Sequence, residues 1–338
     1  MARGYQSYRG RMPGWKKGLI IVLLLILVLA GGFLILQPKL VFNEDGLHWQ
    51  TSKPNSEQSD VQSSDPDDTE DISDDFIIDI PEPEPADILH GVSVDGSAAL
   101  SQDGIQLAEG QRPVVTVKAA NGAFLLDSVT DADAQSIKKK NAASKAVARI
   151  SCFADTKQAD SDNSMAVMSV SGRAWRDPNG NAWLDPYDEN AKAYLVGIVQ
   201  KCVALGYSEI ILEDVQFPTY GIVDRVTYGA QEDTPETRTA AVNAFLKQVK
   251  DAVSGTDVKI SIVLPATILE TKQDGVAGWD LSAIAQSVDR IYMNVEDQAA
   301  ADATRTAVAA LRDGADAEEF FAALTKTPLD GGSYVLIK

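Results

Sequence analysis

Strand-like and helix-like segments alternate from about residue 90 to the C-terminus of this 338-residue chain. Short runs rich in valine and isoleucine, typical of strands, are separated by stretches with the apolar spacing of helices. We count seven such runs, at 91–94, 114–119, 147–153, 210–212, 259–266, 289–296 and 333–338. Strands that alternate with helices form parallel sheets, because each helix returns the chain to the same end of the sheet.

Two α/β architectures are compatible with this alternation. A TIM-like (β/α)8 barrel is the natural candidate, with one of its eight strands missing or disguised. We expect helices over 299–312 and 316–325, so the barrel is predicted to be incomplete or degenerate near its C-terminus. An open, doubly wound sheet is the alternative, but no glycine-rich phosphate-binding loop supports it.

The clearest predicted helix opens at Asp185 and Pro186 and ends at Gly206. Aspartate accepts hydrogen bonds from free backbone amides at a helix start, and proline already has a helical φ at the first position. Its apolar residues share one face, which predicts the side that covers the sheet. They are Ala191, Tyr194, Leu195, Ile198, Val199, Cys202 and Leu205.

An uncharged apolar run from Leu19 to Leu36 precedes the alternating region. Together with its two neighbours it is long enough to cross a bilayer, so we expect an uncleaved transmembrane helix over 18–37. A cleavable signal peptide is the alternative, although its apolar region would be shorter and would end at a small-residue cleavage site. Five positive charges in residues 1–17, against only Lys39 just after the run, predict a cytoplasmic N-terminus and an extracellular C-terminal domain.

Most of the chain's net charge of −19 lies in one acidic stretch. Residues 44–87 carry fifteen acids and one lysine, and they are rich in serine and proline. Such a segment buries too little apolar surface to fold, so we predict a disordered linker over 38–88 and a barrel domain over 89–338. Because no basic stripe exists outside the N-terminal tail, nucleic acid is not an expected partner.

Cysteine and histidine offer little material for metal or redox chemistry. Cys152 and Cys202 occupy positions typical of small core residues, which favours buried free thiols over a disulfide. The two histidines, His48 and His90, lie outside the predicted core. We therefore predict neither a metal site nor a cofactor, and no histidine-based catalytic triad.

Two adjacent acids, Glu213 and Asp214, follow the buried run Ile210–Leu212. In a parallel α/β barrel, chemistry is placed at the C-terminal ends of strands. An acid at such a position can also simply cap a turn or face solvent. Strand alternation would direct the two adjacent side chains to opposite faces, so they are not predicted to flank one bond.

Four segments follow one known family in order and spacing. They are VVTVKAANG at 114–122, VARISCFAD at 147–155, the block 183–218, and WDLSAIAQSVDRIYMNVED at 279–297. The chain resembles the bacterial putative glycosyl hydrolase domain family of TIM barrels, as a divergent member. The family is similar to retaining glycosidases, which implies a polysaccharide or glycan as substrate.

The resemblance implies that Glu213 holds the family's acidic position, where the family motif is Phe-Asp-Tyr-Val-Arg-Phe-Pro and this chain has LEDVQFP. The family's arginine is replaced by Gln216, and its Asp-Val-Lys-Asp strand is reduced to Thr116–Ala119, which keeps only Lys118. Glycoside hydrolysis uses two carboxyl groups. The candidate catalytic residues are Glu213, Asp214, Glu270 and Glu296, with Asp155 as a further strand-end acid.

Cations, amides and aromatic rings near the predicted strand ends are candidates for binding a sugar. The candidate substrate-binding residues are Lys118, Arg149, Trp175, Tyr187, Gln216 and Trp279. A strand-end cation can instead pair with an acid, and an aromatic ring can instead fix a loop to the core, which is the role we expect for Trp183.

Two functional classes follow from these residues. The first is a membrane-anchored, extracytoplasmic glycoside hydrolase that acts on an envelope or extracellular polysaccharide, with the lipid bilayer contacted through 18–37. The second is a barrel without catalysis that serves as a carbohydrate-binding or scaffolding module. The family acid kept at Glu213 favours the first class, and the losses around Lys118 favour the second.

Overall fold

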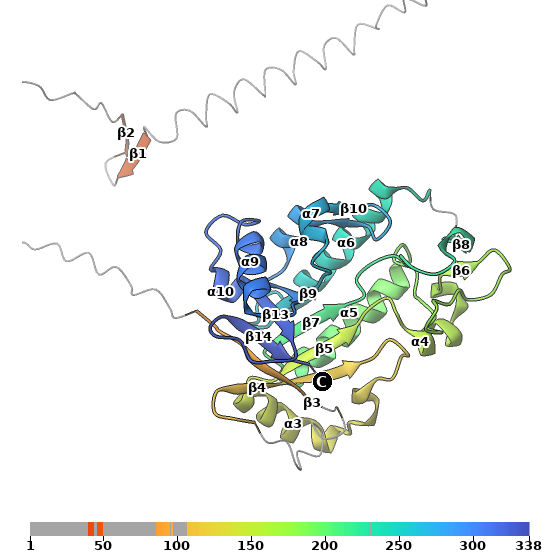
Figure 1. Cartoon of the computed structure of the whole chain (residues 1–338), viewed down its shortest axis with the longest axis horizontal. Coiled ribbons are helices and arrows are strands. Elements are labelled where there is room, and N and C mark those ends of the chain that lie inside the picture. Colours follow the sequence, from red (N-terminus) through yellow and green to blue (C-terminus); the bar gives the residue numbers. More distant parts are fainter. Residues whose placement is uncertain are drawn as a thin grey trace, which may run out of the picture. The chain divides into compact units, whose positions relative to one another are not determined.

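The computed structural model describes residues 40–43, 46–49, 86–94, 96, 107–229 and 232–337 (Figure 1). The chain divides into two units, 1–79 and 80–338. In the first unit, β1 (Leu40–Asn43) and β2 (Gly46–Trp49) form an antiparallel pair. The predicted anchor over 18–37 and most of the predicted linker lie outside the described residues. Among the described residues, no helix has the length and apolar character needed to span a membrane.

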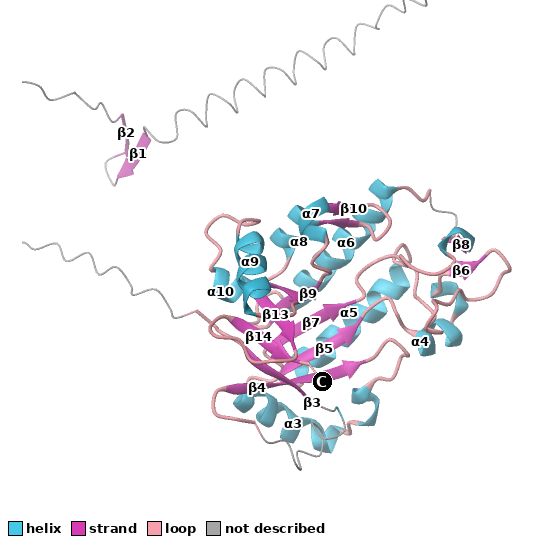
Figure 2. Cartoon of the chain, viewed as in Figure 1, coloured by secondary structure: helices cyan, strands magenta, loops and turns pink. Residues whose placement is uncertain are grey.

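The second unit is a closed barrel of eight parallel strands, as the alternation predicts. Around the barrel the order is β12-β13-β14-β3-β4-β5-β7-β9. The strands are β3 (His90–Val94), β4 (Gln111–Lys118), β5 (Val147–Ser151), β7 (Glu209–Glu213), β9 (Lys259–Val263), β12 (Arg290–Asn294), β13 (Phe321–Thr325) and β14 (Ser333–Leu336). Figure 2 shows these strands in the middle of the domain, with helices around them.

The eighth strand lies where a helix was predicted. Helix α10 (Ala317–Phe320) is only one turn long, and β13 follows it at once, so the prediction of a helix over 316–325 is wrong beyond Phe320. All five residues of β13 are buried, and they pair in parallel with β12 and β14. Alanine and leucine favour helices in isolation, but burial between two strands overrides this preference. The barrel is therefore closed, and no strand is missing.

The main helices cover the outside of the barrel. They are α3 (Asp131–Ser144), α4 (Thr156–Ser161), α5 (Glu189–Ala204), α6 (Pro235–Val253), α8 (Leu281–Ser287) and α9 (Gln298–Ala309). The predicted apolar face of α5 is confirmed, since Leu195 and Val199 are fully buried. Its predicted start is wrong, because Asp188 caps the helix by accepting from the Ala191 amide. Asp185 accepts from the Tyr187 amide in the preceding turn instead.

Apolar side chains form two layers, one between barrel and helices and one inside the barrel. The inner layer alternates with the outer one along each strand, which identifies the inward positions. It contains Leu89, Val114, Val147, Ile211, Tyr292, Ala322, Leu324 and Val335. Cys152 and Cys202 are buried and unpaired, which confirms the predicted free thiols.

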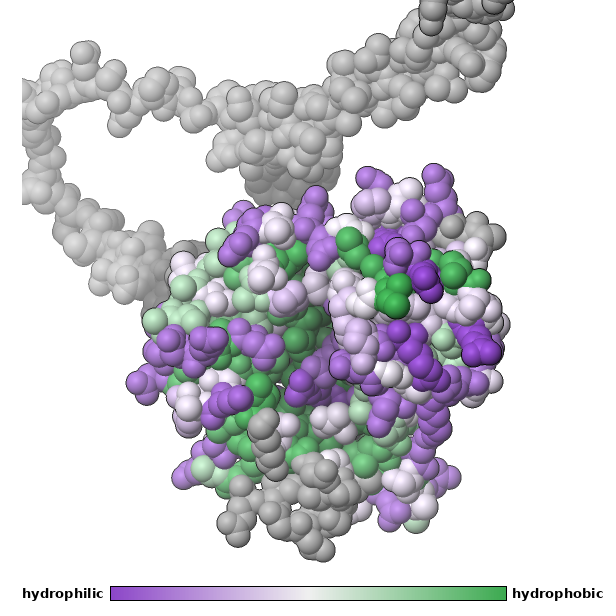
Figure 3. All heavy atoms as spheres, turned by 45° about the vertical axis from the view of Figure 1, so that its right-hand side comes forward, coloured by the Kyte–Doolittle hydropathy of each residue, from purple (hydrophilic) through white to green (hydrophobic). Residues whose placement is uncertain are grey.

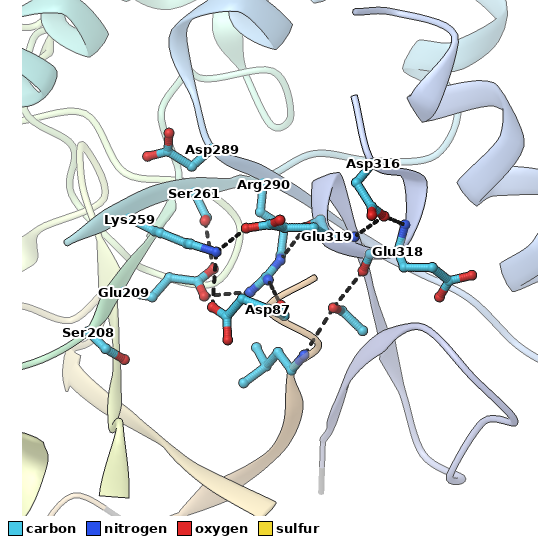
Figure 4. A network of polar contacts seen from close by, with 12 residues as sticks. Asp87, Ser208, Glu209, Lys259, Ser261, Asp289, Arg290, Asp316, Glu318 and Glu319 are labelled. Atoms are coloured by element: carbon cyan, nitrogen blue, oxygen red, sulfur yellow. Dashed lines mark hydrogen bonds and ion pairs between the residues drawn. The ribbon is translucent and has the colours of Figure 1, made fainter. Parts of the chain in front are cut away.

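A buried polar network fills the N-terminal end of the barrel (Figure 4). The Glu209 and Arg290 side chains are fully buried and pair at 2.5 Å. Glu209 also accepts from the hydroxyls of Ser261 at 2.6 Å and Tyr292 at 2.7 Å. Arg290 donates to the Glu319 backbone oxygen at 2.6 Å. A buried ion pair requires such additional hydrogen bonds, and this end of a barrel serves stability.

The segment that enters the barrel is fixed to the same end by Asp87. Its backbone oxygen accepts from Arg290 at 2.7 Å, and its carboxylate pairs with Arg112 at 3.1 Å and Lys259 at 2.9 Å. Burial opposes ionisation of Asp87, but the hydrogen bond from Lys259 and the nearby positive charges lower its pKa. The chain therefore reaches the barrel at the end opposite the C-terminal ends of the strands.

Candidate active site

The C-terminal ends of β5 and β7 bring an arginine and a glutamate together inside the barrel. Val147 and Ile211 belong to the inner apolar layer, so strand alternation also directs Arg149, Ser151 and Glu213 inward. The Arg149 guanidinium lies 2.6 Å from a Glu213 carboxylate oxygen, and the two side chains are 22% and 23% exposed. This ion pair is therefore partly accessible to solvent at the strand ends.

Asp214 does not point away from Glu213 as strand alternation would require. Strand β7 ends at Glu213, and Asp214 has a φ of 53°, in the left-handed region that few residues other than glycine adopt. Its carboxyl oxygen lies 2.6 Å from the Ser151 hydroxyl, and Ser151 pairs with Glu213 in the strand register. The expectation of opposite faces is wrong because the backbone leaves the strand at this residue. Backbone strain of this kind is often kept at functional sites.

The Ser151 hydroxyl lies between the Asp214 carboxyl and the backbone of Ala154. The Ser151 hydroxyl oxygen lies 2.6 Å from the Asp214 carboxyl and 2.9 Å from the backbone oxygen of Ala154. A hydroxyl has one proton, so it can donate to only one of two acceptors. The Ala154 oxygen also accepts from the Lys118 ammonium at 3.3 Å, so the serine proton is available to the Asp214 carboxyl. Burial raises the pKa of Asp214, and the charge of Glu213 adds to this effect, although the Ser151 hydrogen bond opposes it.

Lys118 and Asp155 form a buried pair behind this site. Their side chains have no exposed surface, and their charged atoms lie 3.1 Å apart. Lys118 also donates to the Ser151 backbone oxygen at 2.5 Å, so it supports the end of β5. Asp155 accepts from the Gln158 amide and caps α4, and it accepts from the Tyr194 hydroxyl at 3.1 Å. The structure thus places the predicted substrate-binding Lys118 out of contact with solvent.

A loop built on Asp177 lies beside the acid pair. The buried Asp177 carboxylate accepts from the Asn181 amide, from the Trp183 indole at 3.2 Å and from the Tyr220 hydroxyl at 2.7 Å. Burial opposes ionisation, but these hydrogen bonds lower the pKa of Asp177. Its negative charge is one of those that raise the pKa of Asp214. Trp183 is 1% exposed, which confirms that it fixes its loop to the core.

The predicted aromatic candidates are held by the protein itself. Trp175 is 5% exposed and donates to the Ile222 backbone oxygen, and Trp279 is 6% exposed and donates to that of Val215. The Tyr187 hydroxyl contacts Thr237 at 2.8 Å. Tyr220, which sequence reasoning missed, is 41% exposed and lies close enough to Asp214 for that charge to contribute to its raised pKa. Tyr220 is thus better placed to meet a ligand.

The remaining predicted residues lie at the same end of the barrel with fewer contacts. Gln216 is half-buried, and its amide lies 3.4 Å from the Thr219 hydroxyl. Glu270, in the short helix α7 (Ile268–Thr271), and Glu296, just after β12, are both exposed. Neither side chain makes a hydrogen bond or ion pair with any described residue. Of the predicted acids, the structure therefore brings together Glu213 and Asp214.

Three contributing residues were not predicted, namely Ser151, Asp177 and Tyr220. Ser151 follows Arg149 by two residues in a predicted strand, so alternation alone could have assigned it inward. Asp177 opens the turn Asp-Pro-Asn-Gly, a signal for loop structure but not for its neighbours. Within the described part of the chain, no cluster of three or more histidine, cysteine or acidic residues is arranged to hold a metal ion.

Figure 3 turns forward the side of the domain toward which β5 and β7 point in Figure 1. Hydrophilic and hydrophobic side chains both reach the surface there. This mixture suits a ligand with polar groups and apolar ring faces, as in many binding sites. The site thus combines a partly exposed Arg149–Glu213 pair, a carboxyl group at Asp214 with a raised pKa, and an exposed aromatic ring.

The family described as putative glycosyl hydrolase domain matches residues 117–294. No curated protein sequence matches the chain. The glycoside hydrolase domain of PgaB (BpsB) from Bordetella bronchiseptica is 11% identical, with a TM-score of 0.49 over 74% of this chain and 94% of that one. The glycoside hydrolase domain of PelA from Pseudomonas aeruginosa is 18% identical, with a TM-score of 0.38 over 74% and 100%. A hypothetical protein from Ruminiclostridium thermocellum is 21% identical, with a TM-score of 0.39 over 50% and 96%. At these identities the likeness concerns the fold alone.

Proposed function

The chain belongs to the putative glycosyl hydrolase domain family, and from this premise we propose that its barrel cleaves glycosidic bonds with Asp214 as the proton donor. One observation carries the proposal. The left-handed backbone of Asp214 turns its carboxyl to Ser151, which pairs with Glu213, and burial and the charge of Glu213 raise the pKa of Asp214 there. A carboxyl group with a raised pKa is what protonation of a leaving group requires.

In the proposed mechanism, Asp214 protonates the glycosidic oxygen while the bond to the anomeric carbon breaks. The sugar ring then carries positive charge, as in the transition states of glycosidases generally. Glu213 supplies the negative charge that stabilises this ring. Water then adds to the anomeric carbon and gives a proton to the Asp214 carboxylate, which restores the acid. Arg149 holds the Glu213 carboxylate in place at 2.6 Å. The exposed Tyr220 ring is the proposed surface for a sugar unit next to the cleaved bond.

The proposed substrate is an envelope or extracellular polysaccharide, and the proposed location is the outer side of a membrane. The apolar run over 18–37 and the positive charges before it support an anchor with a cytoplasmic N-terminus. The acidic linker then joins the barrel at Asp87, opposite the strand ends that carry Glu213.

The test is to incubate the purified full-length protein with cell-envelope polysaccharides and to measure released reducing ends. Asp214→Asn keeps the shape of the side chain and removes its acidic proton, so the rate should fall by about 10²–10⁴-fold. Asp251→Asn, on the exposed side of α6, is the matched control and should retain the wild-type rate. Undiminished activity in Asp214→Asn would remove this residue from the mechanism.

A barrel that binds carbohydrate without cleaving it is the second candidate. It is favoured by the direct pairing of Glu213 with Arg149, and by Ala119, which replaces a family acid beside Lys118. In that case no polysaccharide would release reducing ends with either form. Wild type and Asp214→Asn would then bind the same polysaccharide with similar affinity, and this result would decide for the non-catalytic module.

A further inference from the structure

A cleft of about 380 Å³ lies on the outside of the barrel, away from the acid pair. It is bounded by the connection after β4, by α4 and by the outer side of α5. The lining residues are Gly122, Phe124, Asp127, Lys157, Gln158, Ala193, Tyr194, Gly197, Ile198 and Lys201. A cleft of this volume is within the range of small-ligand sites.

Gly197 lines this cleft in the middle of α5, where glycine weakens a helix relative to alanine. Its φ is not in the left-handed region, so the backbone does not require glycine here. Apart from the neighbouring backbone of α5 itself, no described atom lies within 4 Å of the position where a side chain would begin. Packing within the protein therefore does not explain this glycine. Space kept open at the edge of a cleft is explained by a molecule that occupies it.

The charges in the cleft select the kind of molecule. The Lys201 ammonium lies 5.2 Å from the centre of the Phe124 ring and has no carboxylate partner among the described residues. Lys157 pairs with Asp127 at 2.9 Å, so the lining keeps a net positive charge in a chain of net charge −19. The side-chain amide of Gln158 makes no hydrogen bond within the described residues. The half-buried rings of Phe124 and Tyr194 provide apolar walls.

We propose that this cleft is a second carbohydrate site, which binds an acidic sugar unit such as a uronic acid. Lys201 meets the sugar carboxylate, Gln158 meets a hydroxyl, and the ring face lies over Gly197. The choice of a sugar rests on the proposed function, whereas the choice of an anion rests on the charges of the cleft. A site outside the barrel mouth would hold a long polymer while another part of it is cleaved.

The two sites share one buried residue. The Asp155 carboxylate accepts from the hydroxyl of Tyr194, which lines the cleft, and pairs with Lys118 inside the barrel. The backbone of Gly122 also lies close to Asp155, since a side chain at Gly122 would collide with Asp155 and Lys157. Asp155 therefore links the cleft to the buried Lys118, which supports the end of β5.

The experiment is calorimetric titration of the full-length protein with a tetramer of galacturonic acid, and with its methyl ester as the uncharged counterpart. The tetramer should bind, and the ester should bind about fivefold more weakly, because it loses the ion pair with Lys201. Lys201→Gln should weaken tetramer binding by about fivefold, the effect of one exposed ion pair. Gly197→Leu should abolish binding by filling the cleft, while thermal unfolding stays at or above the wild-type temperature. Lys247→Gln, an exposed lysine on α6, is the charge control and should bind as wild type does.

Asp214→Asn separates this site from the proposed active site. Tetramer binding that persists in Asp214→Asn supports a site in the cleft, even if the protein cleaves no polysaccharide. Binding that disappears in Asp214→Asn would place the tetramer at the barrel mouth and overturn the proposal. The proposal also fails if Lys201→Gln and Gly197→Leu bind the tetramer normally. It fails as well if the tetramer does not bind but inorganic phosphate does, and if Lys201→Gln weakens the binding of phosphate.

Discussion

The buried pair of Glu209 and Arg290 permits a stability prediction whose size follows from its contacts. Glu209→Leu leaves the Arg290 guanidinium without its counter-charge in a position with no exposed surface. The hydroxyls of Ser261 and Tyr292 lose their acceptor at the same time. Removal of one partner from a buried ion pair costs about 3–5 kcal/mol. Most domains are stable by only about 5–15 kcal/mol, so this is a large fraction of the total.

The measurement is thermal unfolding of the full-length protein, followed by circular dichroism. A loss of about 3–5 kcal/mol corresponds to a fall in melting temperature of roughly 6–20 °C for a domain of this size. The double variant Glu209→Leu/Arg290→Met should recover most of this loss, because apolar replacement of a whole buried pair is often neutral. Recovery should remain incomplete, since the backbone oxygens of Asp87 and Glu319 lose their donor. If the double variant is no more stable than Glu209→Leu alone, the coupling between the two charges is refuted.

Three further predictions concern the pH dependence, the α5 face and the topology. The pKa of Asp214 is raised in the fold, so the stability gained from its bound proton is lost as pH rises through that pKa. Asp214→Asn should therefore raise the melting temperature more at pH 8 than at pH 4. An equal effect at the two pH values would contradict the raised pKa. Leu195→Asp buries an unpaired charge under α5 and should unfold the domain, whereas Gln200→Asp on the exposed side of α5 should not. Similar melting temperatures of the two variants would show that the buried face of α5 is wrongly assigned. Protease added to intact cells should release the barrel by cutting within residues 51–85, and a barrel digested only after lysis would overturn the outward orientation.

Seven barrel strands were predictable because each is a compact β-prone run between helical patterns. The eighth strand, β13, was not, because its sequence FAALT contains two alanines and a leucine, which favour helices, and its strand conformation depends on β12 and β14. The same distinction applies at the candidate site. Glu213 and Arg149 follow from strand ends and alternation, which are local features of the sequence. Asp177 and Tyr220 reach the site from a distant turn and loop, and a single sequence contains no signal for that approach.

Asp214 shows where the alternation rule stops. The rule holds while the backbone stays extended, and it correctly places Arg149 and Glu213 on the inner face of adjacent strands. One residue later the backbone turns into the left-handed region, so the next carboxyl returns to the same side. Aspartate tolerates this conformation better than most residues, because its short polar side chain can hydrogen-bond locally. Two adjacent acids at the end of a buried strand are therefore compatible with a single site whenever the second one can leave the strand. The pairing then places two carboxyl groups side by side and raises the pKa of Asp214, and a carboxyl with a raised pKa beside a second carboxyl is what acid-assisted hydrolysis of a glycoside requires.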